Sequence, residues 1–369
     1  MSVRRQLVNF GSTSTDYRVG TGAFDELPRL FKNVVGEPKR ALLAYDELAS
    51  DEQRSLVRRA LIDCGFAVEE YNAAGKGACE ASLDTSSSLM RTLASSSITA
   101  DDVMVALGGA NVCSLVSYCG QMWCGGMSCA AIPLTLDAMC TVPTAMRPLS
   151  VDDAPEMVSV RPGWSLVVCD IDFVLGKDAR ELGLGYAYLL GAAFASSRRV
   201  WEQCGEKVAG MADDDPVAFA DALCAAQTSR AGAVRSANPS ARNSIYYGIS
   251  TARALRACLK EKLPSHLALA EGMRFEARLA HDVCGLDVDL VFEQDDRFDD
   301  LGVEEAAFDV DVDTFIDALK RTCYVRSNRF MLALPKFPGA IRLCHIEEDV
   351  LRRHAEAYLA SRAELLEEL

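Results

Sequence analysis

"DDVMVALGGANVCSLVSYCG", residues 101–120, passes from an apolar run (Val103 to Leu107) through Gly108 and Gly109 into a helix-like pattern. A buried strand, a tight glycine turn and a helix N-terminus form the phosphate-binding turn of many dinucleotide-binding domains, because the first N–H groups of the helix have no partner within it. A Gly-Gly pair is also an ordinary turn from strand to helix. The sequence on either side distinguishes these two roles.

Strand-like and helix-like patterns alternate through the first 170 residues. Four segments indicate strands, of which the first is expected to be buried: "RALLAYD" (40–46), "AVEEYN" (67–72), "DVMVALG" (102–108) and "SCAAIP" (128–133). The segments between them have apolar residues at helical spacing, and short connections favour a parallel sheet covered by helices. Ligands of such sheets bind at the carboxyl ends of the strands, where Asp46 and the turn at 108–111 are expected.

The second half has a different pattern. Ala-rich amphipathic runs predict helices, and an extended pair of segments precedes a final helix at 347–366. The helical runs are 179–202, 216–236, 241–259 and 265–283. We therefore predict an α/β Rossmann-like domain with a parallel-rich sheet over residues 1–172, and a mainly α-helical domain over 173–369.

The acid-rich piece "EQDDRFDDLGVEEAAFDVDVD" (293–313) is interpreted as a solvated connector. Its Asp309, Asp311 and Asp313 have the spacing of a calcium loop. However, Thr314 stands where the turn glycine belongs and Lys320 where the bidentate glutamate belongs, which disfavours calcium.

Composition excludes several classes of function. The chain has 369 residues and a formal charge of −15, which argues against binding to nucleic acid or to an anionic membrane surface. No apolar run reaches the roughly 18 residues of a membrane helix, and the N-terminus has no apolar core of signal-peptide length, so we expect a cytoplasmic protein. The 14 cysteines lack zinc-motif spacing, and the four histidines lack an HExxH arrangement.

Motifs along nearly the whole chain resemble one family. "YRVGTGAFDELPRLF" (17–31) is similar to its opening strand and helix. The block 106–150, the segment "VVCDIDFVLGKDARELGLGYAYLLG" (167–191) and the closing segment 329–359 follow in the same order. The chain is thereby identified as a divergent member of the 3-dehydroquinate synthase family, the sugar-phosphate cyclases, in preference to the iron-containing alcohol dehydrogenases of similar plan. The resemblance implies a dimeric lyase of the shikimate pathway of aromatic amino acid biosynthesis. Its members use NAD and zinc to cyclise a phosphorylated seven-carbon keto-acid.

The resemblance places the family's zinc ligands, one glutamate and two histidines, at positions that have lost them. These positions hold Tyr188, Ile249 and Ser265, while His266 lies one residue out of register. One residue on a helix is about 100° of rotation, so His266 is not a simple substitute. Tyr, Ile and Ser cannot form a three-ligand zinc site. We predict no zinc, and a former metal pocket narrowed by Tyr188, Tyr246 and Ile249.

The nucleotide side is altered less. The resemblance assigns NAD contacts to five residues: Asp46, Gly108, Gly109, Asn111 and Thr135. Asp46 stands where a ribose hydroxyl is held, and the two glycines keep the turn. The family's later glycine and aspartate are Cys113 and Ser114 here, and its G-E-x-x-K has become "GKGAC" (75–79).

Basic residues of the family's substrate site fall on Arg147 and Arg242, with Arg253 at a former histidine position. They form a candidate pocket for a small phosphorylated or carboxylate ligand. Surface ion pairing is the alternative.

Three hypotheses of function follow. The first is a catalytically degenerate 3-dehydroquinate synthase-like protein, a pseudoenzyme with a binding or regulatory role. The second is an active sugar-phosphate cyclase or NAD-dependent oxidoreductase of altered chemistry. The third, a conventional synthase with misaligned ligands, is disfavoured because His266 and His281 would lie about 22 Å apart on one helix.

Overall fold

The computed structural model describes residues 2–34, 39–146, 148–152, 154–325 and 327–367. The chain divides into two compact units, Met1–Leu175 and Gly176–Leu369. The sequence placed this boundary after residue 172. None of the described helices is both long and apolar enough to span a membrane.

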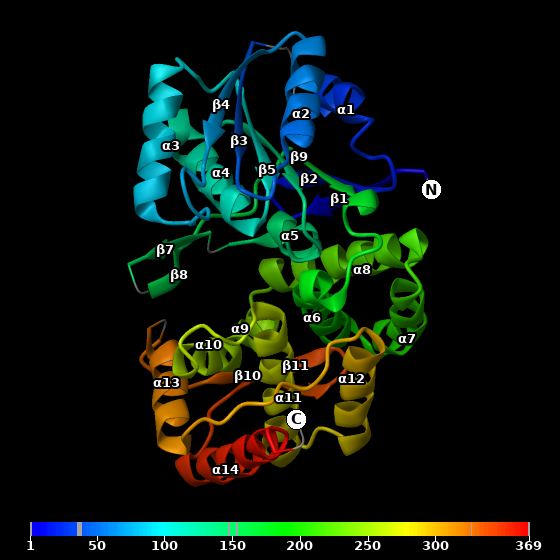
Figure 1. The fold of residues 1–369 in the computed structure, drawn as a ribbon, viewed down its shortest axis with the longest axis vertical. Helices are drawn as coiled ribbons and strands as arrows, with labels where there is room; N and C mark the ends of the chain where they lie inside the picture. The colour runs from blue at the N-terminus through cyan, green and yellow to red at the C-terminus, as the bar shows by residue number, and fades with distance from the viewer. Residues whose placement is uncertain (1, 35–38, 147, 153, 326, 368–369) are drawn as a thin grey trace. The chain divides into compact units, whose positions relative to one another are not determined.

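Unit 1 is built on a seven-stranded sheet (Figure 1). Its strands, in order across the sheet, are β1 Arg4–Asn9, β2 Ser14–Gly20, β9 Leu166–Asp170, β6 Ser128–Pro133, β5 Val103–Gly108, β3 Arg40–Tyr45 and β4 Ala67–Asn72. Neighbouring strands run parallel except β1, which pairs antiparallel with β2. The interior strand β5 is buried at every residue, as expected of a parallel strand covered on both faces.

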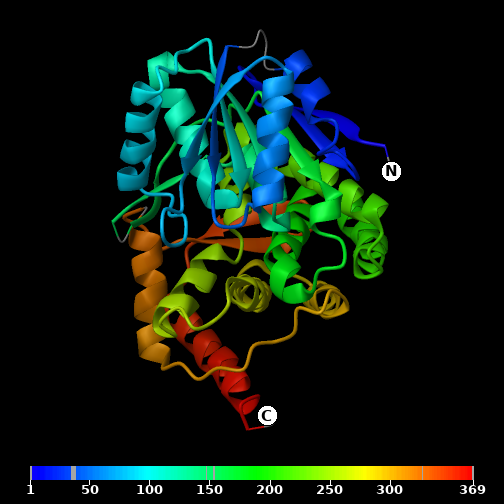
Figure 2. The same ribbon diagram turned by 45° about the horizontal axis from the view of Figure 1, so that its top comes forward.

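Helices cover both faces of this sheet (Figure 2). They are α1 Leu27–Val34, α2 Asp51–Asp63, α3 Leu83–Ser95, α4 Ala110–Met122 and α5 Leu136–Thr141. On one face α1 and α2 pack against Val103, Val105 and Leu107 in a single apolar core. On the other face α4 approaches so closely that a side chain at Gly120 would collide with Cys129 of β6. A hairpin that the sequence did not predict, β7 Leu149–Val151 and β8 Ala154–Val158, completes the unit.

Unit 2 is mainly helical, with one hairpin. Its helices are α6 Ala179–Ser196, α7 Arg198–Ala212, α8 Pro216–Arg235, α9 Pro239–Asn243, α10 Ile249–Cys258, α11 Ser265–Cys284, α12 Val288–Asp300, α13 Val312–Tyr324 and α14 Glu348–Glu364. The hairpin is β10 Leu332–Phe337 and β11 Ala340–Cys344. Helix α11 is the core helix, because every residue from Ala268 to Ala277 is buried. The predicted fold class, an α/β domain with a parallel-rich sheet followed by a mainly helical domain, is confirmed.

Three sequence-based predictions in unit 2 are wrong. The run 241–259 is not one helix, because α9 ends at Asn243 and α10 begins only at Ile249, after Gly248 with a φ of +80°. The run 179–202 is two helices, because Ser197 is extended and its hydroxyl accepts the Val200 N–H at the start of α7. The acid-rich piece 293–313 is not a solvated connector: its first part lies in α12, and Val303 at its centre is buried. Asp295 and Asp299 of α12 both lie in ion pairs with the fully buried Arg274.

Candidate functional site

The predicted nucleotide turn lies where the structure brings two neighbouring strands to their carboxyl ends. In the parallel pair of β3 and β5, Tyr45 is opposite Leu107. The next residue after β3, Asp46, is therefore next to the glycine turn that follows β5. Its carboxylate is 3% exposed, and its Oδ2 accepts the N–H of Gly109 at 2.8 Å while Oδ1 accepts the N–H of Leu48 at 3.1 Å. Burial raises the pKa of Asp46.

The shape of the turn depends on Asp46. Gly108 has a φ of +146°, and a Cβ on it would collide with the Asp46 carboxylate. The glycine is thus explained by the close approach of this side chain, without reference to a ligand.

Two further contacts tie the loop after β4 to the same edge. Oε2 of Glu47 accepts the Cys79 N–H at 3.0 Å, and the side-chain amide of Asn111 donates to the Cys79 carbonyl oxygen at 2.7 Å. Asn111, predicted to contact NAD, is therefore engaged with the protein itself. Thr135 is at the N-cap of α5, with no hydrogen bond from its side chain to the helix amides.

These residues fit a pyrophosphate poorly in the observed arrangement. The first-turn N–H groups of α4 are available in principle. However, the Gly109 N–H already has an acceptor, and that acceptor is the carboxylate of Asp46. A carboxylate at the start of a helix occupies the position that a phosphate would take. Its negative charge also repels an incoming phosphate. Lys76, the basic residue of the neighbouring loop, is exposed.

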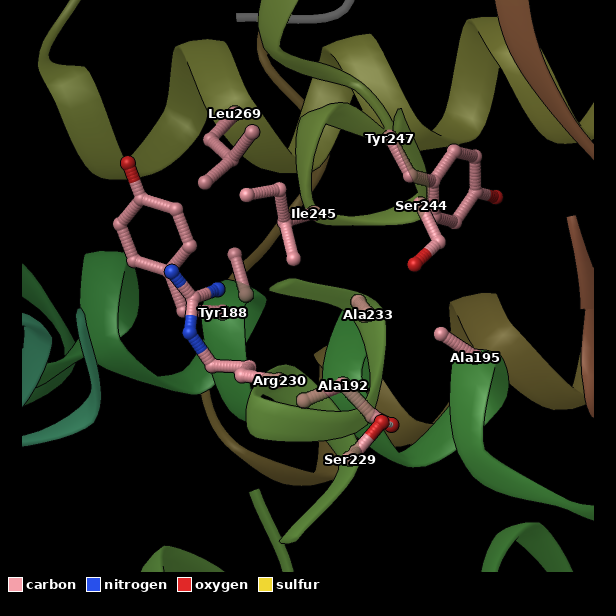
Figure 3. A pocket seen from close by; sticks show the side chains of 12 residues that line it. Tyr188, Ala192, Ala195, Ser229, Arg230, Ala233, Ser244, Ile245, Tyr247 and Leu269 are labelled. Carbon is pink, nitrogen blue, oxygen red and sulfur yellow. Dashed lines mark hydrogen bonds between the residues drawn. The ribbon is translucent and has the colours of Figure 1, made fainter. Parts of the chain in front are cut away.

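Tyr188, which the resemblance places at a zinc-ligand position of the family, lies on α6 in unit 2 and is half-buried. The guanidinium carbon of Arg230, a residue of α8 that is 7% exposed, lies 5.7 Å from the centre of the Tyr188 ring. Ile245 and Leu269 extend toward the same space (Figure 3). The cavity that these side chains line measures about 20 Å³, room for about one water molecule.

The other two positions that the resemblance assigns to zinc ligands are at the starts of helices. Ile249 is the first residue of α10, and Ser265 is the exposed first residue of α11. His266 packs instead against Gly183 of α6, where a Cβ would be 3.1 Å from the His266 Cβ. Burial lowers the pKa of His266. Of the three residues predicted to narrow the pocket, only Tyr188 lines this cavity.

The remaining histidines have main-chain partners. His281, His345 and His354 each place a ring nitrogen within 3.2 Å of a carbonyl oxygen. Across the described ranges, no group of three or more His, Cys, Asp or Glu side chains is arranged to hold a metal ion.

The predicted anion-binding arginines that the structure describes lie on two different helices. Arg242 is exposed in the last turn of α9, and Arg253 is half-buried in α10. Arg147 lies outside the described residues. The buried cation in this part of unit 2 is Arg230, which sequence reasoning missed. Its only signal is a charged residue within an Ala-rich helical run.

A tight crossing of α10 and α11 supports this part of unit 2. Gly248 precedes α10 with a φ of +80°, and a Cβ on Gly272 of α11 would collide with the Gly248 carbonyl oxygen. Beneath the crossing, the buried carboxylate of Glu276 accepts the Gly248 N–H and the Thr251 hydroxyl, each at 2.8 Å. Burial raises the pKa of Glu276 to about 7. The helix that begins at Ile249 is thus capped by a carboxylate from α11.

No protein-family model matches the sequence. Comparison with known proteins finds relatives that are all named 3-dehydroquinate synthase. The 3-dehydroquinate synthase of Xanthomonas oryzae pv. oryzae (strain PXO99A) is 27% identical over 210 residues, 56% of this chain and 55% of that protein, so the match spans about half of its length. The 3-dehydroquinate synthase of Caulobacter vibrioides (strain NA1000 / CB15N) is 24% identical over 288 residues, 75% of this chain and 77% of that protein.

Solved structures agree on the fold. ValA, a 2-epi-5-epi-valiolone synthase from Streptomyces hygroscopicus subsp. jinggangensis 5008 with NAD+ and Zn2+ bound, superposes with a TM-score of 0.79. The alignment covers 98% of this chain and 99% of that chain at 17% identity.

Proposed function

Because the chain is a divergent member of the 3-dehydroquinate synthase-like family, we propose that it has lost the zinc-dependent cyclisation of that family and has a binding or regulatory role. The observation that carries this proposal is Tyr188. A phenol packed with Arg230 stands where the resemblance places a metal-binding carboxylate, and the cavity beside it has a volume of only about 20 Å³. A zinc ion bound by three protein side chains needs N, O or S donors directed at one point, and Ile249 supplies none.

Zinc supplies the Lewis acid of this family's reaction, and its loss removes the group that activates the substrate hydroxyl. What the residues of this chain do instead is structural. Arg230 and Tyr188 fill the space, and His266 joins α6 to α11.

The test combines metal analysis with an activity assay. Purified protein is incubated with Zn²⁺, NAD and the phosphorylated seven-carbon keto-acid, then assayed for released phosphate and for 3-dehydroquinate. We expect neither product, and no stoichiometric zinc after dialysis. Product formation together with one zinc per chain would overturn the proposal.

A variant of the same chain tests whether the three side chains, and not the rest of the fold, prevent zinc binding. The triple substitution Tyr188→Glu, Ile249→His and Ser265→His restores the family's ligand types. We expect the triple variant to gain zinc binding that the parent chain lacks. If the parent already binds zinc equally well, ligands outside these three positions hold it.

An NAD-dependent enzyme of altered chemistry is the second candidate, favoured by the retained glycine turn at the start of α4. Calorimetry with NAD, NADP and ADP-ribose tests it, and absence of binding would count against it. The variant Asp46→Asn removes the charge at the turn and should increase the affinity for ADP-ribose. Glu47→Gln is the control, because Glu47 contacts Cys79 and not the turn itself.

The proposal includes a homodimer, a cytoplasmic location and a small phosphorylated or carboxylate ligand, all of which the family resemblance implies. Light scattering on the purified protein gives the mass of the assembly. A monomer at micromolar concentration would contradict the dimer.

A further inference from the structure

Two cysteines of unit 2 meet at the ends of their secondary structure elements. Cys284 is the last residue of the core helix α11, and Cys344 is the last residue of β11. Their sulfur atoms are 3.3 Å apart, although the residues are 60 positions apart in the chain. Both are free thiols, and both are half-buried.

Partial exposure distinguishes this pair from the cysteines that are buried in the core. Cys119 and Cys129 of unit 1 are both buried within the protein core, where a soluble oxidant has no access. The Cys284 and Cys344 side chains keep part of their surface in water. A thiol must be both near its partner and accessible to react with a small oxidant.

Burial disfavours the Cys284 thiolate, and two basic side chains partly oppose that effect. Lys336 and Arg342 act on Cys284 in the direction that lowers its pKa, while burial, first, and then the Cys344 thiol raise it to about 12. The contribution of Cys344 disappears once its sulfur has been capped by a mixed disulfide. The second thiol is therefore easier to ionise after the first has reacted.

We propose that Cys284 and Cys344 form a dithiol–disulfide site that a low-molecular-weight disulfide oxidises to an intramolecular bond. This inference does not depend on the proposed function.

The chemistry balances with that oxidant alone. The Cys344 thiolate attacks one sulfur of the small disulfide, forms a mixed disulfide and releases one small thiolate. The Cys284 thiolate then attacks the Cys344 sulfur, forms the protein disulfide and displaces the second small thiolate. Two protein thiols lose two electrons, the small disulfide gains them, and the two protons pass to the released thiolates.

The bond would join the C-terminal end of α11 to the β10–β11 hairpin and close a loop that contains α12 and α13. Cross-linking positions so distant in sequence restricts the unfolded chain, so the oxidised form should be the more stable one. The 3.3 Å separation indicates that little of the folded structure has to move.

The experiment uses the full-length chain treated with oxidised glutathione and then digested with trypsin without reduction. Cleavage after arginine places Cys284 in peptide 279–297 and Cys344 in peptide 343–352, and each contains one cysteine. We expect mass spectrometry to find these two peptides cross-linked, with a loss of two of the 14 thiols and a thermal midpoint several degrees higher.

Serine variants test each role. Cys284→Ser should stop at the mixed disulfide on Cys344 and show no increase in midpoint. Cys344→Ser should form no cross-link, and Cys124→Ser, which changes an exposed cysteine elsewhere, should behave like the parent chain. If the parent chain shows only glutathione adducts or unmodified thiols at 284 and 344, the site does not exist. That outcome is measured on the parent chain, so it does not depend on whether any variant folds.

Discussion

Glu276 offers the most direct test of how unit 2 is held together. Its carboxylate is 1% exposed and caps α10 through the Gly248 N–H and the Thr251 hydroxyl. Among the described residues no ion pair involves Glu276, so its charge is stabilised by hydrogen bonds from Gly248 and Thr251. We consider the isosteric substitution Glu276→Gln. A glutamine can accept the Gly248 N–H with its oxygen and donate to the Thr251 hydroxyl with its nitrogen.

The magnitude follows from the pKa. Burial raises the pKa of Glu276 from 4.5 to about 7. At about 1.4 kcal/mol per tenfold change, ionising this group costs about 3 kcal/mol more in the folded chain than in the unfolded chain.

The sign of the pH dependence follows from the order in which the two states release the proton. Below pH 4.5 Glu276 is protonated in both states, and no penalty applies. Between pH 4.5 and about 7 the unfolded chain ionises first, so the free energy of unfolding falls as the pH rises. Above pH 7 both states are ionised, and the penalty is constant.

Urea unfolding of the parent chain and of Glu276→Gln from pH 4.5 to pH 8 measures this penalty. We expect the variant to match the parent near pH 4.5 and to be more stable by up to about 3 kcal/mol at pH 8. Glu206→Gln on the surface of α7 serves as the control and should leave the pH profile unchanged. A Glu276→Gln profile parallel to that of the parent would refute the reasoning.

Two further substitutions test the packing of α11. Gly272→Ala should cost about 3 kcal/mol or more in unfolding experiments, because the new Cβ collides with the Gly248 carbonyl oxygen, a backbone atom that cannot rotate away. Gly191→Ala on α6 is its control, since a Cβ there meets only the end of a methionine side chain at 3.7 Å, and it should be neutral or stabilising by up to about 1 kcal/mol. Tyr358→Phe removes a hydroxyl that donates to the buried Glu271 carboxylate at 2.6 Å, and chemical denaturation should show a loss of about 1.5–3 kcal/mol. An unchanged midpoint for Tyr358→Phe would mean that the other donors to Glu271 suffice.

Local patterns were sufficient for most elements of unit 1. The apolar run before Gly108 predicted β5, and the glycines predicted the turn into α4. Such patterns are properties of residues that are neighbours along the chain, so no knowledge of the fold is needed.

The error at 293–313 arose because acidic composition was equated with exposure. Val291, Gln294 and Phe298 are buried at helical spacing within α12, a signal that the sequence already contained. The acids beside them are tolerated because Arg274 comes from α11 to pair with Asp295 and Asp299. Composition carries no information about such a partner.

The sequence by itself determined most of the strands and helices of unit 1, the glycine turn after β5 and the family resemblance. Only the tertiary structure decided what the remaining polar groups do. Asp46 and Gly109 are 63 residues apart, and their hydrogen bond exists because β3 and β5 are neighbours in the sheet. Arg230 meets Tyr188 because α8 packs on α6. Hydrogen bonds and packing depend on distance in space, and the fold sets that distance for residues remote in the chain.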